Sequence, residues 1–288
     1  MRAFFLSLIG LTVAATWHGE AQAETLTTAT GYRLEYSVHG KDSSGPIALI
    51  FMHGKNSRHD GRVMIRLADK IAYEGFRVYL PRMPWSQEWD GTHQDATAAL
   101  DALVALAAKD GKKAVVGGQS MGAMFSLVYR PADPPAAIVG KALTSPGQML
   151  DLIPAGTPFW KSITPSLEQA KSLEAAGKGK ERVRLTSTNT MGAQSYEENY
   201  NITPEIFLSF HDLARFPSVK AALAVTTVPV FWAVGTRDPI PNAKRRSFEM
   251  IPAHPKSAYF DFEGEDHNSA MLAAVDKIVP WLKALSAP

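Results

Sequence analysis

The sequence of 288 residues contains no cysteine. A chain without cysteine has neither disulfide bonds nor thiolate ligands for zinc. We therefore expect its stability to come from an apolar core, which a single domain of this length is able to bury. The same absence excludes a cysteine nucleophile.

Charge of either sign is not concentrated anywhere in the chain. The chain has 30 Lys and Arg residues and 28 Asp and Glu residues, which gives a formal net charge of +2. The basic cluster at 178–184 lacks interleaved aromatic residues and is typical of a solvated turn. His53, His59 and Asp60 do not have the spacing of a dedicated metal site. We therefore expect neither a nucleic-acid partner nor a bound metal.

Long apolar runs are missing except at the N-terminus. Arg2 precedes an apolar stretch that reaches about Thr16, and Ala21-Gln22-Ala23 has the small-x-small pattern of a cleavage site. The stretch is too short to span a bilayer. We expect residues 1–23 to be a signal peptide cleaved near Ala23. Export to the periplasm or beyond would follow, without stable membrane insertion of the mature chain.

The remainder, residues 24–288, shows apolar runs that alternate with amphipathic helical patterns. Alternation of this kind is typical of a doubly wound α/β domain, in which helices cover both faces of a mostly parallel sheet. Eight strands are expected, two within residues 26–39 and the others at 46–52, 76–80, 113–118, 136–143, 228–234 and 257–262. We therefore predict one domain built on an eight-stranded sheet.

The alternation is interrupted after the sixth expected strand, over residues 146–227. This interval has an apolar and aromatic patch near Phe159, helical patterns near 165–176 and 204–213, and a polar stretch that ends at Asn201. Long insertions in compact domains are usually functional lids or loops. We predict a cap over the active site. A peripheral decoration that covers a sheet edge is the alternative.

Gly118-Gln119-Ser120-Met121-Gly122 joins an expected strand to an expected helix. An abrupt turn from strand to helix crowds the backbone on both sides, and only glycine fits the crowded positions. The turn lifts the Ser120 hydroxyl above the sheet, beside the N–H of Met121 at the helix N-terminus. The pattern predicts a serine nucleophile. An ordinary tight turn is the alternative.

A serine hydroxyl needs a histidine to accept its proton and usually a carboxylate to orient that histidine. Asp238 directly follows the strand at 228–234, and His267 follows the strand at 257–262. Ligands of doubly wound sheets bind beyond the carboxyl ends of strands, where both residues are expected. A surface histidine and an Asx turn before Pro239 are the alternatives. Glu265 and Asp266 are too close to His267 in sequence to orient its far nitrogen.

Backbone N–H groups are expected to bind the oxyanion that forms when serine attacks a carbonyl. The N–H of Met121 is one candidate, and that of Lys55, after the strand at 46–52, is the second. We expect the Lys55 side chain to be solvated, with steering of an anionic substrate as the alternative. Four residues are predicted to contact substrate, namely His53, Asn56, Trp85 and Trp160, although core packing is the alternative for the tryptophans.

Taken with their order, these motifs resemble those of the α/β-hydrolase family. The resemblance spans the mature chain: His53-Gly54, the Gly118 to Gly122 motif, Gly235-Thr-Arg-Asp238 and Gly264-Glu-Asp-His267. It implies that Ser120 is the nucleophile, His267 the base, Asp238 its orienting carboxylate, and Lys55 and Met121 the oxyanion donors. Gln119 departs from the pattern, since many relatives have histidine there.

The resemblance implies two-step acyl transfer without a cofactor. A small-molecule or lipid-like carboxylic ester is the expected substrate, because an alkoxide leaves more readily than an amine. A lactonase, a lysophospholipase-like lipid hydrolase and a peptidase are alternatives among enzymes. A catalytically silent member that binds a small molecule is the alternative from another class. The sequence leaves the oligomeric state open.

Overall fold

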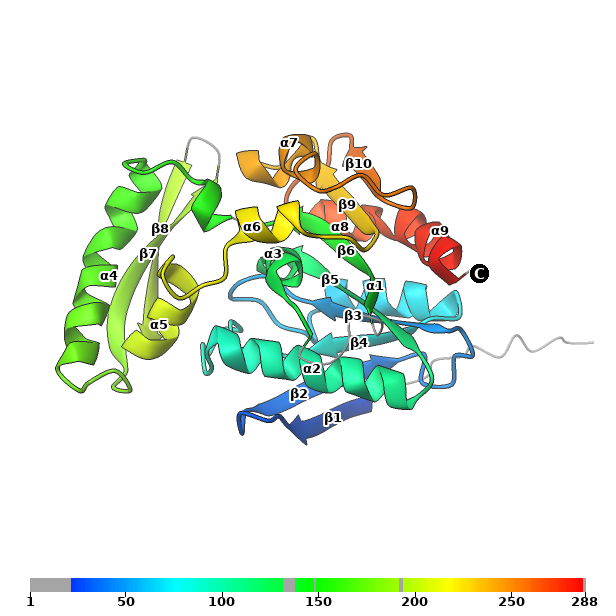
Figure 1. Cartoon of the computed structure of the whole chain (residues 1–288), viewed down its shortest axis with the longest axis horizontal. Coiled ribbons are helices and arrows are strands. Elements are labelled where there is room, and N and C mark those ends of the chain that lie inside the picture. Colours follow the sequence, from blue (N-terminus) through cyan, green and yellow to red (C-terminus); the bar gives the residue numbers. More distant parts are fainter. Residues whose placement is uncertain (1–21, 132–137, 148, 192–193, 287–288) are drawn as a thin grey trace, which may run out of the picture.

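The computed structural model describes residues 22–131, 138–147, 149–191 and 194–286 (Figure 1). Residues 1–21, which hold nearly all of the expected signal peptide, lie outside this range, so cleavage and export stay predictions. Within the described ranges, no helix has the length and apolarity needed to cross a bilayer.

The main sheet has eight strands in the order β1-β2-β4-β3-β5-β6-β9-β10. Pairing is antiparallel between β1 and β2 and between β2 and β4, and parallel in every other pair. The prediction of a mostly parallel eight-stranded sheet is confirmed. The strands are β1 (Gln22–Thr27), β2 (Arg33–His39), β3 (Ile47–Met52), β4 (Arg77–Pro81), β5 (Lys113–Ser120), β6 (Ile138–Pro146), β9 (Val230–Gly235) and β10 (Ala258–Phe262).

Helices cover both faces of this sheet (Figure 1). One face packs on α1 (Arg62–Tyr73), α8 (Ser269–Ala273) and α9 (Val275–Ser286), and the other on α2 (His93–Lys109), α3 (Met121–Val128) and α6 (Val219–Ala224). Alternate residues of β3 therefore enter two different cores: Leu49 and Phe51 join the first, and Ile50 and Met52 the second. Burial on both faces explains why the central strands are continuous apolar runs.

Most of the described part of residues 146–227 forms a layer beside the sheet, at the left of Figure 1. Its elements are η2 (Leu150–Leu152), α4 (Pro158–Ala175), β7 (Val183–Met191), β8 (Gln194–Ile202) and α5 (Pro204–His211), whereas α6 packs on the sheet next to α3. β7 and β8 pair as a two-stranded antiparallel hairpin on which α4 packs. That residues 146–227 act as a cap over the active site stays a prediction.

Several elements differ from those expected. The hairpin β7–β8 lies where the sequence predicts only a polar stretch that ends at Asn201. Its strands are hard to predict because most of their residues are polar; Leu185 and Ile202 are among those that enter the core. α4 begins at Pro158 and continues through Pro165, whereas the pattern predicts a start at Pro165. Proline is favoured at the first helical position, which Pro158 occupies, whereas Pro165 lies inside the helix.

The C-terminal elements are also more broken than the sequence predicts. The helix expected at 242–250 is a short η3 (Pro241–Ala243) followed by α7 (Arg245–Phe248). The single helix expected at 269–285 is divided into α8 and α9 at Ala274. These breaks do not alter the topology of the sheet.

Candidate active site

Ser120 ends β5 and is the N-cap of α3. Its backbone is in the left-handed region, with φ 53°. The turn leaves no room for side chains on either side: a Cβ atom on Gly118 or on Gly122 would lie 2.5 or 2.6 Å from the carbonyl oxygen of Met52. A rarely populated backbone geometry is thus held in place by packing against the neighbouring strand β3, and it is typical of functional sites.

A continuous chain of hydrogen bonds joins Ser120, His267 and Asp238. Nε2 of His267 lies 2.8 Å from Oγ of Ser120, and Nδ1 lies 2.8 Å from Oδ2 of Asp238. A carboxylate accepts hydrogen bonds only, so Nδ1 is the protonated nitrogen and Nε2 is left to accept the serine proton. The three residues are 147 and 29 positions apart along the chain. The structure brings the three together in the geometry of a proton relay.

Asp238 is fixed from two sides. Its side chain is fully buried, and Oδ1 accepts a hydrogen bond from the N–H of Ile240 at 2.9 Å. The loop that carries it is tied to the loop of His267, since the N–H of Arg237 donates to the carbonyl of Glu265. The two loops after β9 and β10 therefore set the distance between carboxylate and imidazole.

Gln119 has a role that the sequence does not predict. Its side-chain amide donates a hydrogen bond of 3.1 Å to the backbone carbonyl of His267, and the residue is buried. Its position directly before Ser120 is the only sequence signal for this role. The bond anchors the loop of His267 directly to β5.

Two backbone segments approach Ser120 where an oxyanion would form. Gly54 follows β3, and a Cβ atom there would lie 3.1 Å from Cβ of Ser120. Gly147 follows β6; its N–H donates to the Ser120 carbonyl at 2.9 Å, and a Cβ atom there would lie 3.1 Å from the nitrogen of Met121. Lys55 and Met121 both line the cavity that contains Ser120. The oxyanion role of their N–H groups stays a prediction.

The cavity above Ser120 has a volume of about 270 Å³. We call two sets of its residues the polar wall and the apolar wall. The polar wall consists of Lys55, Asn56, Ser187, Glu198 and His211, and the apolar wall of Leu150 and Ile240. Residues 146–227 supply Ser187, Glu198, His211 and Leu150 to this lining. The insertion thus forms part of the cavity surface.

Lys55 and Glu198 form an ion pair inside the cavity. The distance from Nζ to Oε2 is 2.5 Å, and the two side chains are 19% and 20% exposed. The hydroxyl of Tyr200 donates to the same carboxylate oxygen. Burial, and after it the charge of Glu198, raises the pKa of the Tyr200 hydroxyl, which therefore stays protonated. The Lys55 side chain is paired and mostly buried, which corrects the expectation of a solvated lysine.

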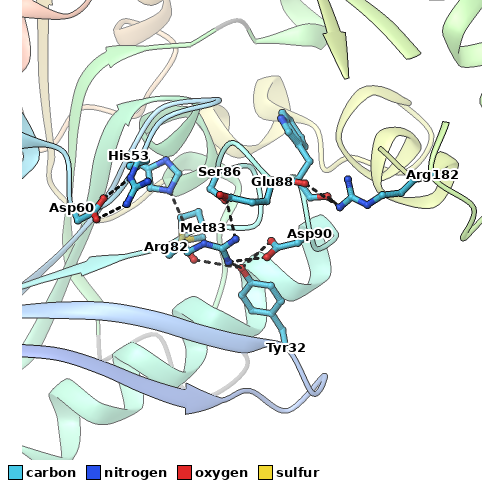
Figure 2. Close-up of polar contacts among 11 residues, drawn as sticks. Tyr32, His53, Asp60, Arg82, Met83, Ser86, Glu88, Asp90 and Arg182 are labelled. Carbon is cyan, nitrogen blue, oxygen red and sulfur yellow. Dashed lines mark hydrogen bonds and ion pairs between the residues drawn. The ribbon is translucent and has the colours of Figure 1, made fainter. Parts of the chain in front are cut away.

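Three of the four residues predicted to contact substrate lie away from the cavity lining. His53 is fully buried: Nε2 accepts from the N–H of Met83 (Figure 2) and Nδ1 donates to the Gly54 carbonyl. Trp85 is also fully buried and donates from Nε1 to the His53 carbonyl. Trp160 donates to the carbonyl of Ile153. These contacts are structural and correct the sequence-based expectation.

Asn56 is the fourth, and it does line the cavity. Its Oδ1 accepts a hydrogen bond of 2.5 Å from Nε1 of Trp89. Asn56 and Trp89 both have a left-handed backbone, with φ 56° and 44°. A hydrogen bond therefore links two residues with positive φ at one edge of the cavity.

The segment between β4 and α2 that carries Trp89 is anchored on two sides, as Figure 2 shows. Arg82 donates to Asp90 at 2.7 Å and to Glu88 at 3.1 Å. Arg182, just before β7, donates to the carbonyls of Glu88 and Trp89. These bonds tie the base of the hairpin to the main domain next to Asn56.

Two buried histidines give a pH prediction for stability. Burial lowers the pKa of both His53 and His211 from 6.5 to about 4. Between these values the unfolded chain binds more protons than the folded one, so the free energy of unfolding falls as the pH drops from 6.5 to 4. The expected loss is about 1.4 kcal/mol per pH unit for each histidine. Urea unfolding at pH 7, 5.5 and 4.5 measures it.

In the same experiment His53→Gln should remove the contribution of His53 to this pH dependence, about 1.4 kcal/mol per pH unit. The matched control is His254→Gln, because His254 lies in a partly exposed loop before β10. If the native protein and His53→Gln lost stability equally between pH 6.5 and 4.5, the neutral buried state of His53 would be wrong.

Within the residues that the structure describes, no group of three or more His, Asp or Glu side chains is placed to hold a metal ion.

The sequence model of a family described as "Alpha/beta hydrolase family" matches residues 49–281. No curated protein sequence matches the chain.

Solved structures that resemble the chain do so at low identity. The structure described as that of the DcsB complex with its substrate analogue has a TM-score of 0.71 at 16% identity and covers 93% of this chain and 100% of its own. Est1E from Butyrivibrio proteoclasticus has a TM-score of 0.63 at 13% identity, with 92% and 99% covered. A monoacylglycerol lipase from Paleococcus ferrophilus has a TM-score of 0.62 at 20% identity, with 88% and 99% covered.

Proposed function

Because this chain belongs to the α/β-hydrolase family, we propose that it is a serine hydrolase that cleaves a small carboxylic ester through an acyl-enzyme on Ser120. The observation that carries the proposal is the chain of two 2.8 Å hydrogen bonds from Ser120 through His267 to Asp238. Such a chain activates a serine hydroxyl that is otherwise a weak nucleophile.

In the first half of the reaction, Oγ of Ser120 attacks the ester carbonyl carbon and its proton passes to Nε2 of His267. The imidazolium that forms is stabilised by the buried carboxylate of Asp238, 2.8 Å from Nδ1. Negative charge develops on the former carbonyl oxygen, and the N–H groups of Met121 and Lys55 are proposed to bind it. The bond to the alcohol then breaks, and the leaving oxygen takes the proton from His267.

In the second half, water attacks the acyl carbon and gives a proton to Nε2 of His267. The bond between the acyl group and Oγ breaks, the proton returns to Ser120, and a carboxylic acid leaves. An ester suits this sequence better than an amide, because an alkoxide is the better leaving group. The similar structure from Paleococcus ferrophilus is a monoacylglycerol lipase, which supports the same class of substrate.

A small substrate is proposed because of the size of the cavity. Its volume is about 270 Å³. Ligand pockets usually measure about 300–1,000 Å³.

We also propose that the protein acts after export, on the basis of its N-terminal sequence.

Labelling with a fluorophosphonate probe tests the proposal. The probe reacts with activated serines, so we expect one label per chain, found by peptide mass on Ser120 and lost in Ser120→Ala. Folding of both proteins is checked by thermal melting. Absence of label on folded native protein, together with no hydrolysis of short esters, would contradict the proposal and favour the silent binding protein.

A further inference from the structure

The two walls of the cavity lie on opposite sides of Ser120. Ser120 ends β5, whose neighbours in the sheet are β3 on one side and β6 on the other, with β9 beyond β6. Lys55 and Asn56 follow β3, whereas Leu150 follows β6 and Ile240 follows β9. A substrate whose reacting carbonyl sits at Ser120 therefore extends toward the polar wall in one direction and the apolar wall in the other.

The polar wall joins the main domain to the hairpin through one balanced ion pair. Lys55 Nζ and Glu198 Oε2 lie 2.5 Å apart, so the two charges cancel locally. Ser187 is directly opposite Glu198 in the register of β7 and β8, and it is buried. Glu198 is the one hydrogen-bond acceptor of Lys55 Nζ found within the described residues. An ammonium has three N–H donors, so two remain to serve a ligand.

His211 adds a hydrogen-bond acceptor to the polar wall. Its Nδ1 donates to the carbonyl of Phe207 at 3.0 Å, which leaves Nε2 as the unprotonated nitrogen. The ring stacks on Phe207 at 4.4 Å between centroids, and this packing fixes its orientation. The polar wall thus offers donors and an acceptor without net charge.

We propose that the polar wall is a specificity subsite for an uncharged, hydroxyl-bearing half of the substrate, while the other half is apolar. A hydroxyl group both donates and accepts a hydrogen bond, which matches Lys55 as donor and Glu198 and His211 as acceptors. This inference rests on the proposed function, because it assigns the substrate class of the same site.

Charged groups fit the polar wall less well. A substrate carboxylate would share a poorly solvated space with Glu198, and like charges in such a space repel. A substrate cation would meet Lys55 in the same way. An apolar group would leave the buried polar atoms of this wall without partners, which costs more than the contact gains. The neutral hydroxyl is the remaining match.

Matched esters test the inference. The first pair differs in the alcohol half: 2-hydroxyethyl butyrate has a hydroxyl where propyl butyrate has a methyl group. The second pair differs in the acyl half: methyl 3-hydroxybutyrate has a hydroxyl where methyl 3-methylbutyrate has a methyl group. Monomethyl succinate is the negatively charged ester and butyrylcholine the positively charged one. We expect the hydroxyl member of one pair to exceed its methyl partner in kcat/KM by at least about 30-fold, and both charged esters by at least about tenfold.

Glu198→Gln gives the decisive variant, because it removes the charge that balances Lys55 and keeps the shape. The hydroxyl preference should fall at least about fivefold and the carboxylate ester should gain at least about fivefold, a reversal that general damage to the fold would not produce. Glu197→Gln is the matched control: Glu197 is the preceding residue of β8 and is exposed. It should leave both ratios within about twofold.

Failure of this inference and failure of the proposed function give different results. Hydrolysis of the methyl esters at rates equal to the hydroxyl esters, or a native preference for the carboxylate ester, would overturn the inference alone. If no ester is hydrolysed, calorimetry on Ser120→Ala decides it: tighter binding of 2-hydroxyethyl butyrate or methyl 3-hydroxybutyrate than of its methyl partner supports the subsite. Equal binding, or no binding, overturns it.

Discussion

Ser120→Ala is expected to lower kcat for ester hydrolysis by about 10⁴- to 10⁶-fold. The reason is that Oγ of Ser120 is the group within 2.8 Å of His267 Nε2, and alanine leaves the imidazole with no nucleophile to activate. Rates on a short chromogenic ester, at saturating substrate and with enzyme concentration set by absorbance, measure the effect. The KM should change much less than kcat, since the cavity lining is intact.

Ser145→Ala is the matched control for this variant. Ser145 lies in β6, next to the strand that carries Ser120, and it is fully buried with φ 41°. Its Oγ atom finds no hydrogen-bond partner within the described residues. Removal of an unsatisfied buried hydroxyl should raise the free energy of unfolding by about 1 kcal/mol. Activity should stay within about threefold, and an equal loss in both variants would argue against Ser120 as nucleophile.

Asp238→Asn is expected to lower kcat about 10⁴-fold at pH 7. The carboxylate accepts from Nδ1 of His267 and so keeps Nε2 free for the serine proton. An amide in its place presents an N–H toward Nδ1, favours the tautomer with the proton on Nε2, and supplies no charge to stabilise the imidazolium. Steady-state rates, compared with the fraction of enzyme that a fluorophosphonate labels, measure the loss.

Asp266→Asn is the control for this second variant. Asp266 precedes the histidine directly, and its Oδ1 accepts from the N–H groups of Asn268 and Ser269 before α8. Those backbone hydrogen bonds lower the pKa of its carboxyl group. An asparagine oxygen can accept the same bonds, so the expected loss of activity is less than about tenfold. A larger loss here than in Asp238→Asn would transfer the orienting role to Asp266.

The sheet and the positions of the proposed triad could be predicted because strong local signals specify them. Strands buried on both faces are continuous apolar runs, as in β3 and β9, and such runs stand out in any sequence. The strand, turn and helix around Ser120 need glycine at both neighbouring positions of the turn. The placement of Asp238 and His267 after later strands then follows from the topology of a doubly wound sheet.

The hairpin and the polar wall could not be predicted, because their signals depend on distant contacts. β7 and β8 contain few apolar residues, so neither strand is an apolar run in the sequence, although β7 packs on α4. Glu198 lies 143 residues from Lys55, and no local pattern pairs them. The sequence predicts that His53 and Trp85 contact substrate, but His53 accepts a hydrogen bond from the backbone of Met83, and Trp85 donates one to the backbone of His53. Residue type alone does not distinguish such structural hydrogen bonds from ligand binding.

The surroundings of Ser120 are built largely from main chain. Gly54, Gly118, Gly122 and Gly147 bring backbone to it without side chains, whereas Leu150, Glu198 and His211 of the cavity lining belong to the layer beside the sheet. The proposed triad lies outside this layer, whereas Ser187, Glu198 and His211 of the polar wall lie within it. Mutation can change which molecules are accepted, by point changes in the layer or by its exchange, without altering the residues that are proposed to break the bond.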